Sequence, residues 1–172
     1  EKADAINGYA VGQLGAIAKS AGVPVVHIST DFVFDGRKVG PYTETDAPHP
    51  VSAYGRSKLL GERELAASGC EHCIIRVEWT YGKNGVNFIT KILEAAKTRD
   101  SLQVVDDQVG SPTHTLAAAR AICDCLGQER FPAGVFHFAA SGYVSRYEMT
   151  RFLFAQLGIA TPVKPCRTAD FQ

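Results

Sequence analysis

Four short apolar stretches, separated by stretches with helical periodicity, constrain the fold of this chain more than any other feature. The strand-like runs are VPVVHIST (23–30), HCIIRVEW (72–79), SLQVVD (101–106) and GVFHFA (134–139). Helical patterns cover roughly residues 4–21, 51–68, 86–99, 114–127 and 145–157. The apolar runs are continuous rather than alternating, which is typical of strands buried on both faces. The order of strands and helices therefore predicts an α/β fold with a mainly parallel sheet covered by helices.

Composition limits the function classes that fit the chain. Of its 172 residues 45% are hydrophobic, which suits one domain with a real core or a large piece of a bigger one. The 18 basic and 18 acidic side chains balance, so no electrostatic argument favours a nucleic acid or a membrane surface as partner. No apolar run approaches the ~20 residues of a membrane-spanning helix, and no secretory signal is recognisable. We therefore expect a cytoplasmic protein.

Two of the five cysteines, Cys70 and Cys73, form the tetrapeptide CEHC, which raises the question of a metal or redox site. Metal sites usually need a second pair of ligands, and redox CxxC pairs normally open a helix. Here Cys73 runs directly into the strand-like CIIRV. We therefore expect free thiols in a reducing cytoplasm and no metal site.

The glycine-rich stretch GYAVGQLG, Gly8 to Gly15, resembles a phosphate-binding turn, since the acidic Asp31 closes an apolar run further along. Such a turn must leave a buried strand and open a helix, because amides at the helix N-terminus hold the phosphates. Here the polar, alanine-rich EKADAIN precedes it and has the character of a helix. One helical face can carry Ala5, Ala10, Leu14, Ile17 and Ala18. We therefore expect the glycines to lie within a helix packed closely on a sheet.

Polar clusters follow two of the expected strands. They are Ser29-Thr30-Asp31 and Glu78-Trp79-Thr80-Tyr81. In an open α/β sheet, ligands bind outside the carboxyl ends of the strands, so these clusters mark a candidate site. The irregular stretch 35–50, DGRKVGPYTETDAPHP, is too long for a simple connection, and we expect it to help wall that site.

Tyr54 and Lys58 stand four residues apart in an expected helix, hence on one face and one turn apart. A phenol with a pKa near 10 is a poor proton donor at neutral pH, but a nearby ammonium lowers that pKa. The pair, with the hydroxyl of Thr30, would form a device for moving a proton onto or off a carbonyl or carbinol oxygen. The alternative is a chance pair on a solvated helix face.

At these residues the chain resembles a known family. HISTDFVFDG, YGRSK followed by LLGE, RVEWTYG and DDQVGSPT resemble the dTDP-4-dehydrorhamnose reductase family of extended short-chain dehydrogenases/reductases. The resemblance runs from AIN in the opening helix to TADF near the end. It implies the C-terminal part of a Rossmann-like doubly wound parallel sheet, interleaved with a small substrate-binding subdomain at roughly 79–115 and 140–172. It also places the family's glycine-rich turn upstream, so we expect a fragment without the N-terminal cofactor-binding half.

The resemblance implies specific roles and ligands. Thr30, Tyr54 and Lys58 would be catalytic, with Tyr54 and Lys58 also binding NADPH or NADH. The reaction would reduce the C4 keto group of a nucleotide-linked 4-keto-6-deoxy sugar, dTDP-4-dehydro-L-rhamnose to dTDP-L-rhamnose, and a homodimer is compatible with it. Thr30, Asp31, Trp79 and Gln108 would contact this substrate. For Trp79 the alternative is packing in the core.

Two residues depart from the family pattern. Phe32 stands where a tyrosine is usual, and Glu78 replaces a small residue before the tryptophan. One alternative function is a non-catalytic subunit similar to the β subunit of methionine adenosyltransferase. A second is another extended short-chain dehydrogenase/reductase acting on a nucleotide sugar, such as a 4,6-dehydratase. Dehydratases place Asp-Glu after the threonine, whereas here Phe32 follows Asp31.

Overall fold

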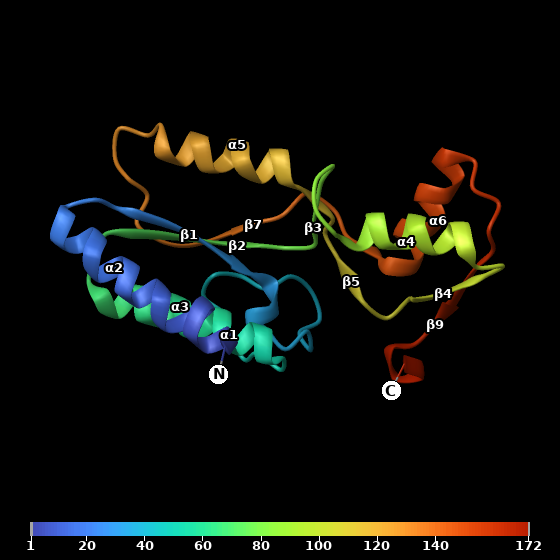
Figure 1. Cartoon of the computed structure of the whole chain (residues 1–172), viewed down its shortest axis with the longest axis horizontal. Helices are drawn as coiled ribbons and strands as arrows, with labels where there is room; N and C mark the ends of the chain where they lie inside the picture. The colour runs from blue at the N-terminus through green and yellow to red at the C-terminus, as the bar shows by residue number, and fades with distance from the viewer. Residues whose placement is uncertain (1, 172) are drawn as a thin grey trace. The chain divides into compact units, whose positions relative to one another are not determined.

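The structure, a computed structural model that describes residues 2–171, divides into two units. The first unit runs to Val77 and resumes from Ala118 to Phe138. The second comprises Glu78–Ala117 and the chain from Ala139 onward. Both contain parallel strand pairs together with helices, which confirms the predicted α/β class (Figure 1).

The sheet of the first unit has three parallel strands in the order β1–β2–β7. The strands are β1 (Val25–Thr30), β2 (His72–Val77) and β7 (Gly134–Phe138). Thr30 lies opposite Val77 and Val77 opposite Phe138, so the carboxyl ends of all three strands meet at one edge. Three of the four predicted strands therefore form this sheet. Helices α2 and α3 lie on one side of it and α5 (Thr115–Leu126) on the other (Figure 1).

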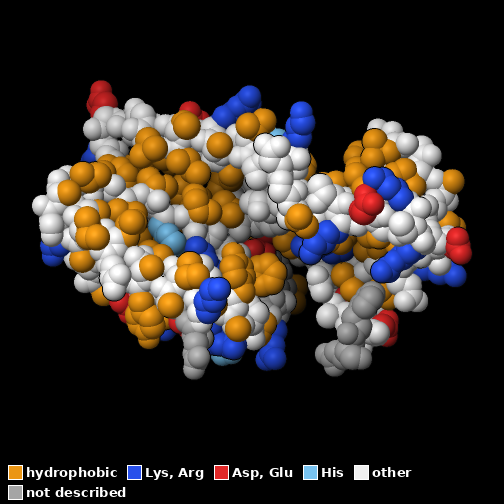
Figure 2. Space-filling view, viewed as in Figure 1, with side chains coloured by type: hydrophobic (Ala, Val, Ile, Leu, Met, Phe, Trp, Pro, Cys, Tyr) orange, Lys and Arg blue, Asp and Glu red, His pale blue; other side chains and the backbone are white. Residues whose placement is uncertain are grey.

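Only the central strand of this sheet is buried along most of its length. Ile74 and Ile75 of β2 are buried, whereas Ile28 of β1 and Phe136 of β7 are each 40% exposed. Figure 2 shows hydrophobic side chains gathered over the strands of the first unit. The expectation that every strand is covered on both faces is wrong for β1 and β7, because the helices described cover the two outer strands incompletely.

Two long helices of the first unit, α2 (Ala10–Ala21) and α3 (Ala53–Ser68), pack closely against each other. A short helix α1 (Lys2–Asp4) and a π-helical turn η1 (Ala5–Tyr9) precede α2. A Cβ added to Gly15 would lie 2.5 Å from Ser68 Oγ, and one added to Gly61 would collide with the backbone carbonyl of Asn7. The glycine-rich stretch is therefore helical, as predicted, and its glycines permit the close approach.

The neighbour of these glycines, however, is helix α3 and not a sheet. The predicted apolar face is also not the buried one, since Leu14 is 56% and Ile17 70% exposed. Gly8 and Gly15 are buried instead. The physical reason is that small residues, and not large apolar ones, let two helix backbones approach each other.

The second unit is built from short strand pairs and two helices. Its helices are α4 (Phe88–Thr98) and α6 (Arg146–Leu157), with a 3₁₀ turn η3 (Thr168–Phe171) near the end. Its strands are β3 (Thr80–Tyr81) beside β6 (Thr113–His114), β4 (Leu102–Val105) beside β9 (Val163–Cys166), and β5 (Val109–Gly110) beside β8 (Val144–Ser145). Both helices begin with capping boxes, at Asn87 and Ser145.

The fourth predicted strand, 101–106, belongs to this second unit and not to the main sheet. Within it Leu102 and Val104 are buried against Phe154, while Gln103 between them is exposed. This alternation is the pattern of a strand covered on one face. The prediction that it joins the other three strands is therefore wrong, because its apolar residues pack on α6 instead.

All five cysteines are free, and burial raises the pKa of the Cys73 thiol, which disfavours a thiolate there. Among residues 2–171 no helix is long and apolar enough to cross a membrane. Within the same residues, no group of three or more His, Cys, Asp and Glu side chains is placed to hold a metal ion.

Candidate active site

The buried hydroxyl of Thr30 lies at the carboxyl end of β1, where the chain turns into a 3₁₀ helix η2 (Asp31–Val33). Thr30 Oγ1 accepts from the backbone N–H of Phe32 at 3.2 Å and donates to Asp31 Oδ1 at 2.9 Å. A hydroxyl has one proton, so donation to a substrate oxygen requires that proton to leave Asp31. Thr30 and Asp31 therefore act as a local pair at the edge of the sheet.

Tyr54 lies in the first turn of α3, whose N-cap Ser52 accepts from Gly55 N at 3.0 Å. Its side chain is 49% exposed, and its ring meets that of Phe32 edge to face at 5.8 Å. The residue that departs from the family pattern thus supports the tyrosine ring by an aromatic contact. Tyr54 and Lys58 share α3, one turn apart, as predicted.

The ammonium of Lys58 is held against the middle of β1. Nζ donates to the carbonyl oxygen of Ile28 at 2.6 Å and lies 3.2 Å from Nε2 of His27. Burial lowers the pKa of Lys58, with the carboxylate of Glu62 acting in the opposite direction. Burial, and then the charge of Lys58, lower the pKa of His27 to about 4. A histidine that sequence reasoning did not single out therefore contacts the predicted catalytic lysine.

A buried polar row crosses the sheet of the first unit. Ser29 lies opposite Arg76, and Arg76 opposite His137, in the strand register. The guanidinium of Arg76 binds the carboxylate of Glu62 on α3 through Nε at 3.0 Å and Nη2 at 2.7 Å, while Ser29 Oγ donates to Glu62 Oε1 at 2.5 Å. Arg76 Nη1 lies 3.4 Å from His137 Nε2. This network links all three strands to α3 directly beside the candidate site.

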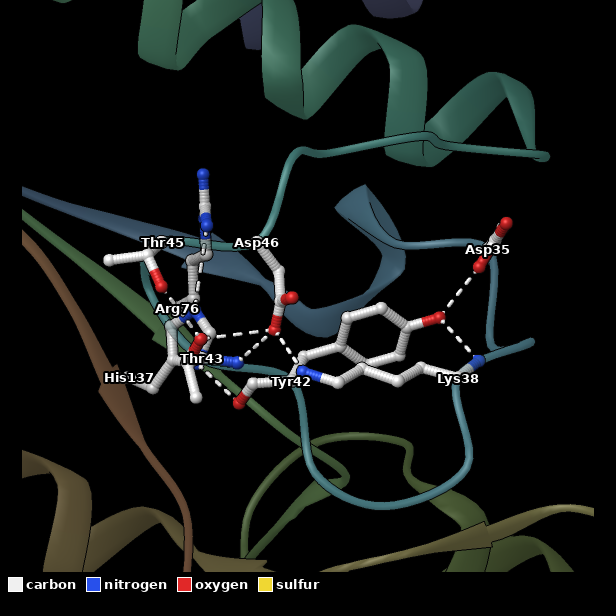
Figure 3. Close-up of polar contacts among 8 residues, drawn as sticks. All are labelled: Asp35, Lys38, Tyr42, Thr43, Thr45, Asp46, Arg76 and His137. Carbon is white, nitrogen blue, oxygen red and sulfur yellow. Dashed lines mark hydrogen bonds and ion pairs between the residues drawn. The ribbon is translucent and has the colours of Figure 1, made fainter.

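The stretch 35–50 is braced by its own polar contacts (Figure 3). Tyr42 donates its hydroxyl to Asp35 Oδ1 at 2.6 Å and accepts from the backbone N–H of Lys38 at 3.1 Å. Asp46 binds Lys38 Nζ at 2.5 Å and the Thr43 N–H at 2.7 Å. The hydrogen bond from Lys38, followed by that from the Thr43 backbone, lowers the pKa of Asp46 to about 2. The stretch therefore has a defined conformation.

This stretch is also tied to the end of β7. The backbone N–H of His137 donates to Glu44 Oε1 at 2.8 Å, and its Nδ1 lies 3.3 Å from the Tyr42 carbonyl oxygen. The ring of Tyr42 stacks on Phe34 at 4.3 Å. The stretch thus lies at the same sheet edge as Thr30, and its role as a wall of the site stays a prediction.

Trp79 and Gln108 belong to the second unit, whereas Thr30, Tyr54 and Lys58 belong to the first. Trp79 is half-buried and has a left-handed backbone, φ 40°, and the guanidinium of Arg146 covers its ring at 3.4 Å. Gln108 is exposed, and its Nε2 donates to Thr168 Oγ1 at 3.1 Å. Beside Trp79 is a small cavity of about 90 Å³, lined by Trp79, Thr80, Tyr81, Phe88, Ile89, Arg146 and Met149.

Residues that sequence reasoning missed are His27, Glu62, Arg76 and His137. A signal was present for three of them, because VVHIST, CIIRV and VFHF each place one polar or charged residue inside an apolar strand. A buried charge needs a partner, so an arginine in the central strand indicates a nearby carboxylate. The sequence does not indicate which carboxylate pairs with Arg76, because that depends on the tertiary structure.

Residues 1–172 match the family model described as RmlD substrate binding domain. The spore coat polysaccharide biosynthesis protein SpsK of Bacillus subtilis is 36% identical over 99% of this chain and 59% of its own length. A dTDP-4-dehydrorhamnose reductase of Sinorhizobium fredii is 40% identical over 90% of this chain and 54% of its own length. The chain therefore spans about half the length of the curated relatives it matches.

Solved structures agree with these sequence matches. A dTDP-4-dehydrorhamnose reductase from Bacillus anthracis, in complex with NADP, superposes with a TM-score of 0.90 at 30% identity, over 96% of this chain and 59% of that one. An ortholog of this reductase from Clostridium acetobutylicum gives a TM-score of 0.90 at 40% identity, over 96% of this chain and 58% of that one.

Proposed function

Because the chain belongs to the RmlD substrate binding domain family, we propose that it contributes the catalytic residues of a reductase acting on a dTDP-linked 4-keto-6-deoxy sugar. The observation that carries this proposal is the ammonium of Lys58, held by the Ile28 carbonyl of β1, with Lys58 one helical turn from Tyr54 on α3. The reaction would convert dTDP-4-dehydro-L-rhamnose to dTDP-L-rhamnose.

The residues fit a nicotinamide cofactor, NADPH or NADH, which would supply a hydride. The ammonium of Lys58 has three N–H groups, and two of them are used by Ile28 O and His27. The remaining N–H is suited to a ribose hydroxyl. Tyr54 and Lys58 would therefore hold the cofactor as well as serve the chemistry.

In the proposed step, C4 of the sugar receives the hydride and the electron pair of the C4=O bond moves onto oxygen. Tyr54 gives its phenolic proton to that oxygen, and the positive charge of Lys58 stabilises the phenolate that is left. Thr30 polarises the carbonyl by a hydrogen bond once its proton turns away from Asp31. Solvent then returns a proton to Tyr54.

The second unit supplies the substrate-binding region in this proposal, roughly residues 79–115 and 140–172. Trp79 would contact the sugar through the part of its indole that the guanidinium of Arg146 leaves uncovered. Gln108 would offer an amide, and Asp31 of the first unit would be a further sugar contact. The family description as a substrate binding domain and the half-buried position of Trp79 support these roles.

We also propose a cytoplasmic location and a homodimer. Five free cysteines suit a reducing compartment. Light scattering at two protein concentrations tests the dimer, which a monomer mass at both would exclude.

A chimera tests the function directly. This chain would replace the matching segment of the Sinorhizobium fredii reductase, to which it is 40% identical over 90% of its length. We expect the folded chimera to oxidise NADPH or NADH only when dTDP-4-dehydro-L-rhamnose is present. A folded chimera that binds the cofactor yet gives no turnover would contradict the proposal and favour the alternative of a non-catalytic subunit.

A further inference from the structure

Lys58 has two protein acceptors, and one of them is a side chain that no catalytic role includes. We propose that His27 is a positioning residue, whose Nε2 accepts a hydrogen bond from Lys58 and thereby fixes, with the Ile28 carbonyl, the direction of the remaining N–H of that ammonium. The role of that N–H in holding a ribose rests on the function proposed above, whereas the contact itself does not.

The carboxylate of Glu62 is engaged by other donors. Glu62 lies one turn beyond Lys58 on α3, but its oxygens accept from Ser29 and twice from Arg76. Lys58 and Glu62, both from α3, are the charged groups whose electrostatic effects reach His27. Glu62 therefore acts on Lys58 through its charge, while His27 and Ile28 O set the geometry.

The chemistry of the contact fixes the protonation of His27. An ammonium only donates hydrogen bonds, so Nε2 must accept, and the imidazole is neutral with its proton on Nδ1. The pKa of His27, lowered to about 4 mainly by burial, keeps that acceptor available throughout the neutral range. A protonated ring would offer a donor to a donor and would repel Lys58.

Positioning by His27 has a kinetic consequence. A long lysine side chain has many rotamers, and two fixed acceptors select one of them. Loss of His27 should then disturb the alignment of Lys58 with Tyr54 and with the cofactor ribose more than it disturbs binding of the sugar. Turnover would fall while the Michaelis constant for the sugar changes little.

The first measurement needs no variant. Long-range ¹H–¹⁵N NMR of the 172-residue chain at neutral pH distinguishes a protonated from an unprotonated ring nitrogen. We expect His27 to show an unprotonated Nε2 and a protonated Nδ1. A proton on Nε2 would overturn the proposal, whether or not the protein is a reductase.

The second measurement is the pKa of Lys58, followed through its Cε resonance and assigned by loss of the signal in Lys58→Arg. His27→Leu removes the acceptor but keeps the burial, so the pKa of Lys58 should fall by roughly 0.5–1 unit. His27→Gln places an amide oxygen near the former position of Nε2 and should restore the pKa of Lys58. An unchanged pKa in His27→Leu, or a folded His27→Gln that fails to restore it, would overturn the proposal. If His27→Leu does not fold, the proposal is tested by the tautomer of His27 in the unaltered chain and by the pKa of Lys58 in His27→Gln.

Kinetics in the chimera separate this proposal from the proposed function. At saturating cofactor, we expect His27→Leu to lower kcat by about 10-fold with the KM for the sugar nearly unchanged, and His27→Gln to recover most of the lost kcat. Equal losses in both variants would contradict positioning. An inactive parent chimera whose Lys58 pKa still responds to His27 would reject the proposed reaction and leave the contact established.

Discussion

At the scale of single residues, the strongest constraint on the first unit is the charge pair of Glu62 and Arg76, each less than a tenth exposed. Its two hydrogen bonds at 3.0 and 2.7 Å have the fork geometry in which arginine binds a carboxylate. Buried pairs add little net stability, but the loss of one partner leaves an uncompensated charge. The pair therefore makes α3 and β2 dependent on each other.

Glu62→Gln should accordingly lower the free energy of unfolding by ~3–5 kcal/mol, because Arg76 loses its counter-charge. The measurement is urea unfolding followed by far-UV circular dichroism. Glu71→Gln, the same exchange at an exposed position of the first unit, is the matched control and should leave the midpoint unchanged. Equal midpoints for the two variants would show that the pair is not a structural requirement.

The sequence predicts some of these residues and not others. Tyr54 and Lys58 are near in sequence, so helical periodicity alone places them on one face. His27 and Lys58, by contrast, are 31 positions apart, and Arg76 and His137 are 61 apart. Such contacts depend on strand order and register, which local patterns do not determine.

At the scale of elements, the packing of η1 and α2 on α3 depends on glycine. Gly61 lies against the backbone carbonyl of Asn7 in η1, and a backbone atom cannot move aside as a side-chain end can. Glycine inside a helix normally costs ~1 kcal/mol relative to alanine, so an ordinary Gly→Ala change would stabilise α3. At Gly61 the collision of an added Cβ with the Asn7 carbonyl should outweigh this gain, so the change should be destabilising.

We expect Gly61→Ala to destabilise the chain by ~1–3 kcal/mol through overpacking. The control is Gly127→Ala at the end of α5, where an added Cβ would approach only backbone oxygens, the nearest 3.4 Å away. Thermal unfolding by circular dichroism compares the two. A higher melting temperature for Gly61→Ala would mean that the helices separate easily.

Elements also show where pattern reading fails. The runs 72–79 and 101–106 look alike in composition, yet β2 is buried along most of its length while β4 alternates between buried and exposed positions. The polar Gln103 within SLQVVD was the local sign of a one-sided strand. Only the pairing partner, β9, shows that this strand lies outside the main sheet.

At the scale of the whole molecule, Gly8, Gly12 and Gly15 of the opening helix are packed against α3 and do not form a phosphate-binding turn. We therefore expect calorimetry on the 172-residue chain to show no binding of NADPH or NADH. Micromolar affinity that Gly12→Ala and Gly15→Ala abolish would instead assign the glycines to a phosphate site.

Tyr54 is proposed to donate the proton in the carbonyl reduction. The most direct test compares the kcat of the parent chimera with that of a chimera whose Tyr54 lacks the phenolic hydroxyl. Tyr54→Phe keeps the ring and its edge contact with Phe32 while removing the only proton the residue can give. We expect kcat to fall by about 10²-fold or more, with cofactor binding retained, because the general acid is lost. A kcat within about a factor of two of the parent would contradict it.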